Sequence, residues 1–244
     1  MRQTVLRMFV AALMALGWSG NVLWGAYSSR HTTVMEERRV DVGEAQLHFK
    51  WIRGNEVVVL FESGGGMDSS EWDALVPAVA NRTGATVVTY DRAGFGKSPL
   101  PQTPCRMDVE VGWLFAGLNH LGFDRNLILV GHSYGGWIIH LIAGTYPDRV
   151  LGLVYVDPFT VEFVDQFGIA YIDQHPMCGN LPFKHDDPEH LTPYQKALVR
   201  MVGDGMGPRT ELLRQVKLPK DLPGRLISSR KPFLPKAQEQ EAWW

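Results

Sequence analysis

The sequence predicts an α/β protein with a mostly parallel β-sheet that carries helices on both faces. The chain has 244 residues, 45% hydrophobic and 20% charged, which is a globular composition for one domain or two small ones. Several apolar runs have strand length and no polar alternation, as expected for strands buried on both faces. These runs alternate with segments of helical periodicity, which is the pattern of parallel strands joined by helices.

The N-terminal segment, residues 1–30, has the layout of a secretory signal or a membrane anchor. Arg2 and Arg7 precede the uncharged residues 8–29, whose apolar centre is MFVAALMALGW. This uncharged stretch is just long enough to span a bilayer, and a short amphipathic helix packed on the domain is the alternative. We therefore expect export or membrane anchoring, with any membrane contact made through this segment, rather than a cytoplasmic location.

The main domain is expected over residues 38–244. Apolar and polar side chains alternate on both sides of a turn at Gly43–Glu44, which predicts a hairpin over residues 40–51. Ser70 and Asp73 have the spacing of a capping box at the start of the first helix. The predicted strands are 57–61, 85–90, 127–130 and 151–156, and the predicted helices are 72–80, 109–121 and 135–146.

The alternation stops over residues 159–218, which are rich in Pro and Gly and contain short helical pieces such as 194–202. We interpret this segment as an insertion over the sheet edge that forms a lid. A short strand is expected at 225–228. Residues 237–244, AQEQEAWW, have the composition of the first turns of a helix without its C-terminal signals, so the domain is expected to be truncated there.

The net charge argues against nucleic acid as a partner, and the cysteine content argues against a cysteine metal site. The chain has 24 Lys and Arg residues against 26 Asp and Glu residues, a net charge of −2, so it lacks the basic excess that binds nucleic acid. Cys105 and Cys178 cannot form a metal site on their own. Free thiols are the default interpretation, with one disulfide bridge as the alternative in an exported chain.

The motif that carries chemistry is G-H-S-Y-G at residues 131–135, between the apolar run LILV and an apolar helix. In this context the motif predicts a nucleophile elbow, a sharp strand-to-helix turn that lifts a serine hydroxyl out of the sheet. The helix N-terminus favours negative charge that develops beside it. Ser133 is therefore the candidate nucleophile.

With these residues the chain resembles the α/β-hydrolase superfamily, in the branch of esterases, lipases and peptidases. The resemblance covers about residues 40–244 and includes the hairpin, the glycines 64–66, the stretch DRAGFGKS at 91–98 and the elbow. It implies the α/β-hydrolase fold without its last strand and helix, because the chain ends before the eighth strand. It also implies a structural role for residues 91–98, a small-molecule acyl substrate and no cofactor.

The resemblance implies roles for further residues. The oxyanion of the reaction would accept hydrogen bonds from the backbone N–H groups of Tyr134 and Gly65, with Gly66 as a close alternative for Gly65. Asp157, at the end of strand 151–156, is the best candidate for the acid because residues 228–232, SSRKP, which end the predicted strand 225–228 and follow it directly, contain no carboxylate. The alternative that Asp157 only caps or turns the chain stays open. Glu239 and Glu241 are weaker candidates.

The histidine that serves as base in the family follows the eighth strand, beyond the end of this chain. His175, His185 and His190 lie in the predicted lid, and His132 occupies a position with a structural role in the family. The sequence therefore predicts a serine hydrolase that forms an acyl-enzyme on Ser133. The alternative is a non-catalytic or truncated member that lacks the catalytic histidine.

Two other enzyme classes fit the sequence less well. The dehalogenase and epoxide-hydrolase branches of the superfamily use aspartate at the elbow, where this chain has serine. A dinucleotide-dependent oxidoreductase would need glycine at the position of Ser69.

Overall fold

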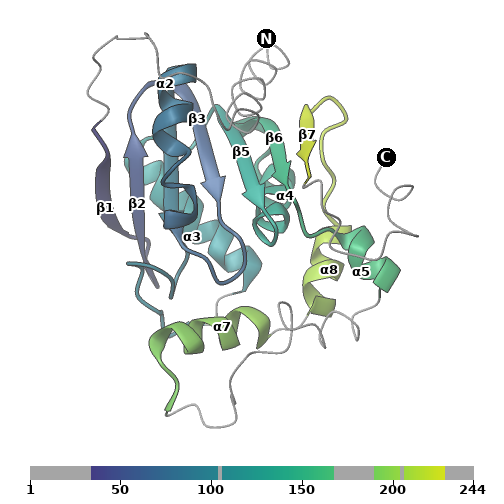
Figure 1. Cartoon of the computed structure of the whole chain (residues 1–244). Coiled ribbons are helices and arrows are strands. Elements are labelled where there is room, and N and C mark those ends of the chain that lie inside the picture. The colour runs from purple at the N-terminus through teal and green to yellow at the C-terminus, as the bar shows by residue number, and fades with distance from the viewer. Residues whose placement is uncertain (1–33, 104–105, 168–189, 204–205, 229–244) are drawn as a thin grey trace, which may run out of the picture.

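The computed structural model describes residues 34–103, 106–167, 190–203 and 206–228, in which seven strands form one sheet in the order β1-β2-β4-β3-β5-β6-β7 (Figure 1). The strands β1 and β2 pair antiparallel, β2 pairs antiparallel with β4, and all other neighbours are parallel. The predicted α/β fold with a mostly parallel sheet is confirmed. The order also differs from that of a dinucleotide-binding sheet. The strands are β1 (Glu36–Asp41), β2 (Gln46–Ile52), β3 (Asn55–Glu62), β4 (Ala85–Asp91), β5 (Leu127–His132), β6 (Val150–Val156) and β7 (Gly224–Ile227).

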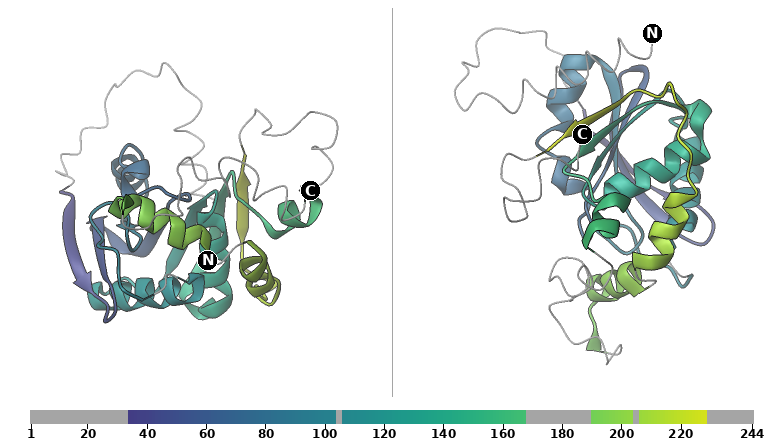
Figure 2. Two further views of the ribbon diagram at one scale, coloured as in Figure 1. Left: turned by 90° about the horizontal axis from the view of Figure 1, so that it is seen from below. Right: turned by 90° about the vertical axis from the view of Figure 1, so that its right-hand side faces the viewer.

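Helices cover both faces of this sheet (Figure 2). A short 3-10 helix, η1 (Ser69–Trp72), and α2 (Val76–Thr83) pack on one face, while α3 (Met107–Leu121) and α4 (Gly135–Thr145) pack on the other. A second 3-10 helix, η2 (Pro147–Arg149), leads from α4 into β6.

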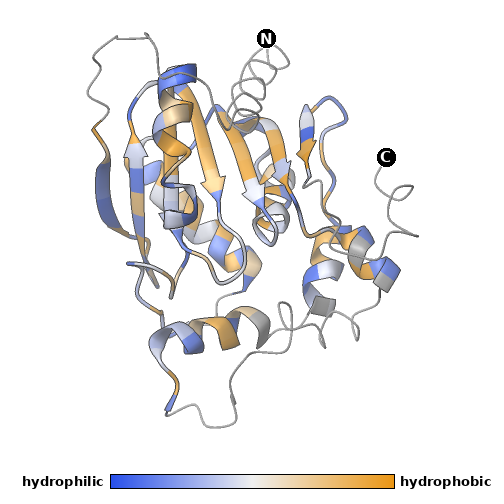
Figure 3. Ribbon diagram, viewed as in Figure 1, coloured by the Kyte–Doolittle hydropathy of each residue, from blue (hydrophilic) through white to orange (hydrophobic). Residues whose placement is uncertain are grey.

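Each central strand contributes side chains to two separate cores. In β3, Val59 and Phe61 pack toward α2, whereas Val58 and Leu60 pack toward α3 and α4. Figure 3 shows the resulting contrast between β3, which is apolar through most of its length, and the hydrophilic edge strand β1. The continuous apolar runs in the sequence therefore correspond to strands covered on both faces.

The start of the first predicted helix is wrong. The chain first forms η1, and α2 begins only at Val76. Pro77 suits the first turn of α2, because the N–H groups there have no acceptor within the helix and proline has no N–H. Ser70 and Asp73 form no capping box. Asp68 instead caps η1, and its carboxylate accepts the N–H of Ser70 at 2.9 Å.

In the described residues of the segment that the sequence predicts to be a lid, the chain forms the helices α5 (Val161–Phe167), α7 (Pro193–Gly203) and α8 (Met206–Arg214). Figures 1 and 2 show α7 across the edge of the sheet where β3, β5 and β6 end. The hydroxyl of Tyr194 on α7 donates to the carbonyl of Gly66 at 3.2 Å. The function of this segment as a lid stays a prediction.

The predictions for residues 1–30 and 237–244, and for the cysteines Cys105 and Cys178, fall outside the described residues. No helix in the described part of the chain combines the length and apolar character needed to cross a membrane.

Candidate active site

Ser133 lies in a strained turn between β5 and α4. Its φ of 49° is in the left-handed region, which non-glycine residues rarely adopt. A Cβ on Gly131 would lie 2.5 Å from the carbonyl oxygen of Gly135, and one on Gly135 would lie 2.5 Å from that of Glu62. The strand–turn–helix geometry predicted for residues 131–135 is therefore present, and it depends on both glycines.

The turn after β6 lies directly beside this elbow. The N–H of Ser133 donates to the carbonyl of Val156 at 3.1 Å, and the N–H of Phe159 donates back to the carbonyl of Ser133 at 3.0 Å. Asp157 lies between these two contacts, with a φ of 39° and its N–H bonded to the carbonyl of Ile227 at 2.8 Å. Asp157 thus turns the chain and also carries a carboxyl group next to the elbow.

The glycine loop, residues 64–66, is the second segment beside the elbow. A Cβ on Gly65 would lie 3.5 Å from the Cβ of Tyr134, and Gly66 has a φ of 75° that favours glycine. Within the described part of the chain, the N–H groups of Gly65 and Tyr134 donate no hydrogen bond to another residue. Two unused donors therefore lie on neighbouring backbone segments beside Ser133.

A buried ion pair between Arg92 and Glu62 lies next to the start of the glycine loop. Arg92 Nη1 donates to Glu62 Oε1 at 2.5 Å and to the carbonyl of Ser63 at 2.7 Å, and Arg92 Nη2 donates to the carbonyl of Gly64. The hydroxyl of Tyr90 donates to the second oxygen of Glu62 at 2.6 Å. Burial raises the pKa of Glu62, and the Arg92 charge opposes this shift. Arg92 thus fixes the carbonyl groups of Ser63 and Gly64, where the chain enters the loop.

Glu71 links the glycine loop to the elbow. Its Oε2 accepts the N–H of Gly64 at 2.9 Å, and its Oε1 forms an ion pair with His132 Nδ1. The contact with Glu71 raises the pKa of His132. Burial alone would raise the pKa of Glu71, but the contacts with His132 and Gly64 lower it below its usual value. Sequence reasoning missed this residue.

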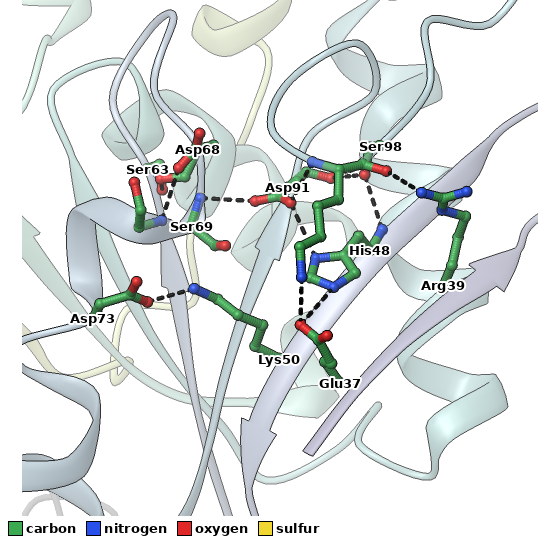
Figure 4. A network of polar contacts seen from close by, with 12 residues as sticks. Glu37, Arg39, His48, Lys50, Ser63, Asp68, Ser69, Asp73, Asp91 and Ser98 are labelled. Atoms are coloured by element: carbon green, nitrogen blue, oxygen red, sulfur yellow. Dashed lines mark hydrogen bonds and ion pairs between the residues drawn. The ribbon is translucent and has the colours of Figure 1, made fainter. Parts of the chain in front are cut away.

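The turn at residues 91–98 is held by hydrogen bonds to Asp91 (Figure 4). Its carboxylate accepts the N–H groups of Ser69 and Lys97, each at 2.9 Å, and lies 3.1 Å from His48 Nδ1. Burial would raise the pKa of Asp91, but these hydrogen bonds lower it. His48 Nε2 lies 3.2 Å from Glu37, so a buried imidazole joins β1 and β2 to the turn. These contacts match the structural role that the resemblance implies for this stretch.

No base for Ser133 is found in the described part of the chain. His190 is exposed just before α7, while His175, His185, Glu239 and Glu241 lie outside the described residues. No described side chain forms a hydrogen bond with the hydroxyl of Ser133. The described residues also contain no group of His, Cys, Asp and Glu arranged to hold a metal ion.

The sequence matches a family model described as the alpha/beta hydrolase fold over residues 57–175. It is 30% identical over 123 residues to the uncharacterized protein YqjL of Bacillus subtilis, which is 50% of this chain and 48% of the relative. It is 40% identical over 72 residues to lipase LipV of Mycobacterium tuberculosis, 30% of this chain and 27% of the relative. It is 33% identical over 141 residues to fluoroacetate dehalogenase of Burkholderia sp., 54% of this chain and 45% of the relative. The matched part is therefore less than half of each relative's length.

Solved structures show the same fold. Haloalkane dehalogenase DatA from Agrobacterium tumefaciens C58 matches with a TM-score of 0.57 at 18% identity, over 79% of this chain and 78% of that one. The 2-hydroxy-6-oxo-6-phenylhexa-2,4-dienoate hydrolase from Rhodococcus sp. strain RHA1 matches with a TM-score of 0.57 at 18% identity, over 82% of this chain and 83% of that one.

Proposed function

Because the chain belongs to the α/β-hydrolase superfamily, we propose that it is a serine hydrolase that cleaves an ester or other acyl bond through an acyl-enzyme on Ser133. The observation that carries this proposal is the elbow itself. A strained serine lies at the carboxyl end of β5, beside the unused N–H groups of Gly65 and Tyr134. The relatives include lipases, epoxide hydrolases and dehalogenases. Serine at the elbow favours the acyl-transfer chemistry.

In the proposed reaction, the Ser133 oxygen attacks the acyl carbon and its proton passes to a base. The carbonyl oxygen becomes an oxyanion, which the N–H groups of Gly65 and Tyr134 stabilise. The alcohol leaves with a proton from the base, and water then hydrolyses the acyl-enzyme. Asp157 is the carboxylate that we propose to orient the base, since the turn after β6 contacts the elbow directly.

The test is covalent labelling of the full chain with a fluorophosphonate probe, with Ser133→Ala as the matched control. We expect the probe to label the wild type and not the variant. The wild type should also hydrolyse a p-nitrophenyl ester, and the variant should not. A folded wild type that neither reacts with the probe nor cleaves the ester would contradict the proposal. The chain would then be a non-catalytic member of the superfamily.

A further inference from the structure

One face of helix α7 lies against the glycine loop and the turn after β4. The side chains of this face are three or four residues apart, which places them on one side of the helix: Tyr194, Ala197, Leu198 and Met201. Ala197 is 2% exposed, and a Cβ on Gly94 would lie only 2.7 Å from its methyl group. The Arg200 guanidinium donates to the carbonyl of Pro101. These contacts, together with the hydrogen bond from Tyr194 to the glycine loop, fix the position of α7.

Beside Gly65 there is a space with the width of one carbon atom. A carbon at the Cβ position of Gly65 would lie 3.5 Å from the Cβ of Tyr134 and 3.4 Å from the Cε methyl of Met201. Both distances are ordinary van der Waals contacts, so a single carbon would touch both walls of this space. Gly65 and Tyr134 also carry the two N–H groups that we propose as oxyanion donors. The space therefore adjoins the position where the oxyanion of the proposed reaction would form.

The wall that α7 contributes to this space is apolar. Met201 is partly buried and packs against the core that contains Tyr134 and Trp137. Its sulfur lies 3.9 Å from the same Cβ position beside Gly65, and Leu198 Cδ2 lies 3.0 Å from a Cβ built on Gly66. The side chains of Met201 and Leu198 carry no charge and no N–H or O–H donor. They therefore suit a hydrocarbon part of the substrate.

The chemistry of the proposed reaction decides which part of the substrate this is. Besides the Ser133 oxygen, the acyl carbon of the tetrahedral intermediate carries the oxyanion, the oxygen of the leaving alcohol and the α-carbon of the acyl chain. The leaving oxygen must receive a proton, so it needs a donor beside it, and Met201 and Leu198 offer none. The α-carbon needs no such partner and is the group that fits the carbon-wide space.

We propose that Met201 is a specificity-determining residue, whose methyl group limits the acyl chain at its α-carbon. The inference rests on the proposed function, since the acyl group must first be transferred to Ser133. A linear chain places one carbon in the space beside Gly65. A branch at the α-carbon adds a second carbon, which would collide with Met201 on a helix that Tyr194 and Arg200 hold in place. The substrate class is therefore esters of acyl groups that are unbranched at the α-carbon.

The test compares two isomeric esters on the full chain, p-nitrophenyl butanoate and p-nitrophenyl 2-methylpropanoate, which share the leaving group and the number of carbon atoms. We expect the wild type to prefer the linear ester by a larger factor than hydroxide does. Met201→Ala removes the wall, so kcat/KM for the branched ester should rise about 10-fold, which is the effect of roughly one methylene group in an apolar pocket. The value for the linear ester should change about threefold or less.

Two further variants separate the wall from a general loosening of α7. Met201→Leu keeps a side chain of similar volume and should retain most of the wild-type preference. Met67→Ala removes a methionine that is 43% exposed and lies beside Gly64, directly after the glycine loop, so it should change neither ester. If Met201→Ala acted only by loosening the helix, the rates on both esters would change by the same factor.

Three results would overturn the inference: a wild-type preference no greater than that of hydroxide, an equal change of both esters in Met201→Ala, or the same change of preference in Met67→Ala. Failure of the proposed function looks different. In that case neither ester is cleaved and the fluorophosphonate probe does not label Ser133, and the assignment of Met201 falls with it.

Discussion

The carboxylate of Glu71 accepts the N–H of Gly64 at 2.9 Å. Its other oxygen contacts His132, the residue before Ser133, and the ring of Trp72 lies 6.4 Å from the His132 ring in an edge-on arrangement. One side chain therefore joins the two backbone segments that carry the proposed oxyanion donors. Glu71 contacts both the glycine loop and the elbow but belongs to neither of them. It is therefore a positioning residue, which holds these two segments relative to each other.

Removal of this link should lower the rate of the chemical step. In Glu71→Ala the N–H of Gly64 loses its acceptor and the glycine loop can shift, so we expect kcat to fall about 10- to 100-fold with a smaller change in KM. Glu71→Gln keeps an oxygen for Gly64 and should lose about threefold or less. Steady-state kinetics with a p-nitrophenyl ester provides the measurement. Asp73→Asn, which changes an exposed carboxylate that pairs with Lys50, is the control, and a comparable loss there would contradict the prediction.

The pair of His132 and Glu71 should make stability depend on pH. The folded pKa of His132 is raised, so its contribution is complete below about pH 6.5 and is lost as pH rises through the folded value. The folded pKa of Glu71 is lowered, so its contribution is complete above about pH 4.3 and is lost as pH falls through the folded value. The pair therefore stabilises the fold most between these two limits.

Urea unfolding at pH 5.5 and 8.5 can measure this effect. The difference in unfolding free energy between wild type and Glu71→Gln should be larger at pH 5.5 than at pH 8.5. The increase should not exceed about 1 kcal/mol, because His132 is partly exposed and solvent weakens its ion pair. Glu44→Gln, in the exposed turn of the hairpin, should show no such change with pH. A difference that grows toward pH 8.5 would exclude the pairing as its cause.

Replacing only one partner of the Glu62–Arg92 ion pair should strongly lower the free energy of unfolding. Arg92→Met leaves a completely buried carboxylate without its cation, so we expect a loss of about 3–5 kcal/mol in unfolding free energy. Addition of Glu62→Gln should recover part of this loss, because no charge is then left unpaired and the amide oxygen still accepts the Tyr90 hydroxyl. Chemical denaturation of both variants is the measurement, and additive losses would refute this account.

Glycine at the elbow should be irreplaceable, while glycine in α3 should not. A Cβ on Gly135 would lie 2.5 Å from backbone oxygen, so Gly135→Ala should destabilise the protein by about 3 kcal/mol. Gly112 is exposed in the interior of α3 and a Cβ there meets nothing within 4 Å, so Gly112→Ala should stabilise by about 0.5–1 kcal/mol. Thermal unfolding of the two variants compares these effects directly.

The sequence predicts the fold well where the pattern of side chains follows from burial alone. The run VVVLF became the central strand β3 because residues on both of its faces are covered, and the hairpin followed from simple alternation. The start of α2 was missed because Ser70 and Asp73 matched a capping pattern that the nearby Asp68 satisfies instead. Local signals cannot decide between neighbouring polar residues that compete for the same N–H groups.

The site was only partly predictable for a related reason. The elbow has a local signature, since the turn needs its small residues at fixed spacing. Glu71 has no such signature, because it acts on His132, which is distant in sequence. A carboxylate shortly after the glycine loop is the one signal that could have indicated Glu71.

The left-handed backbone at Ser133 and Asp157 has a consequence for directed evolution of this chain. Each of these residues adopts a positive φ at a cost of about 1–3 kcal/mol, and glycine would remove much of that cost. A library sorted for heat resistance alone would therefore enrich glycine at both positions and discard the hydroxyl and the carboxyl group together. Screens for robust variants of this protein need an activity readout, because the most heat-resistant members are expected to be inert.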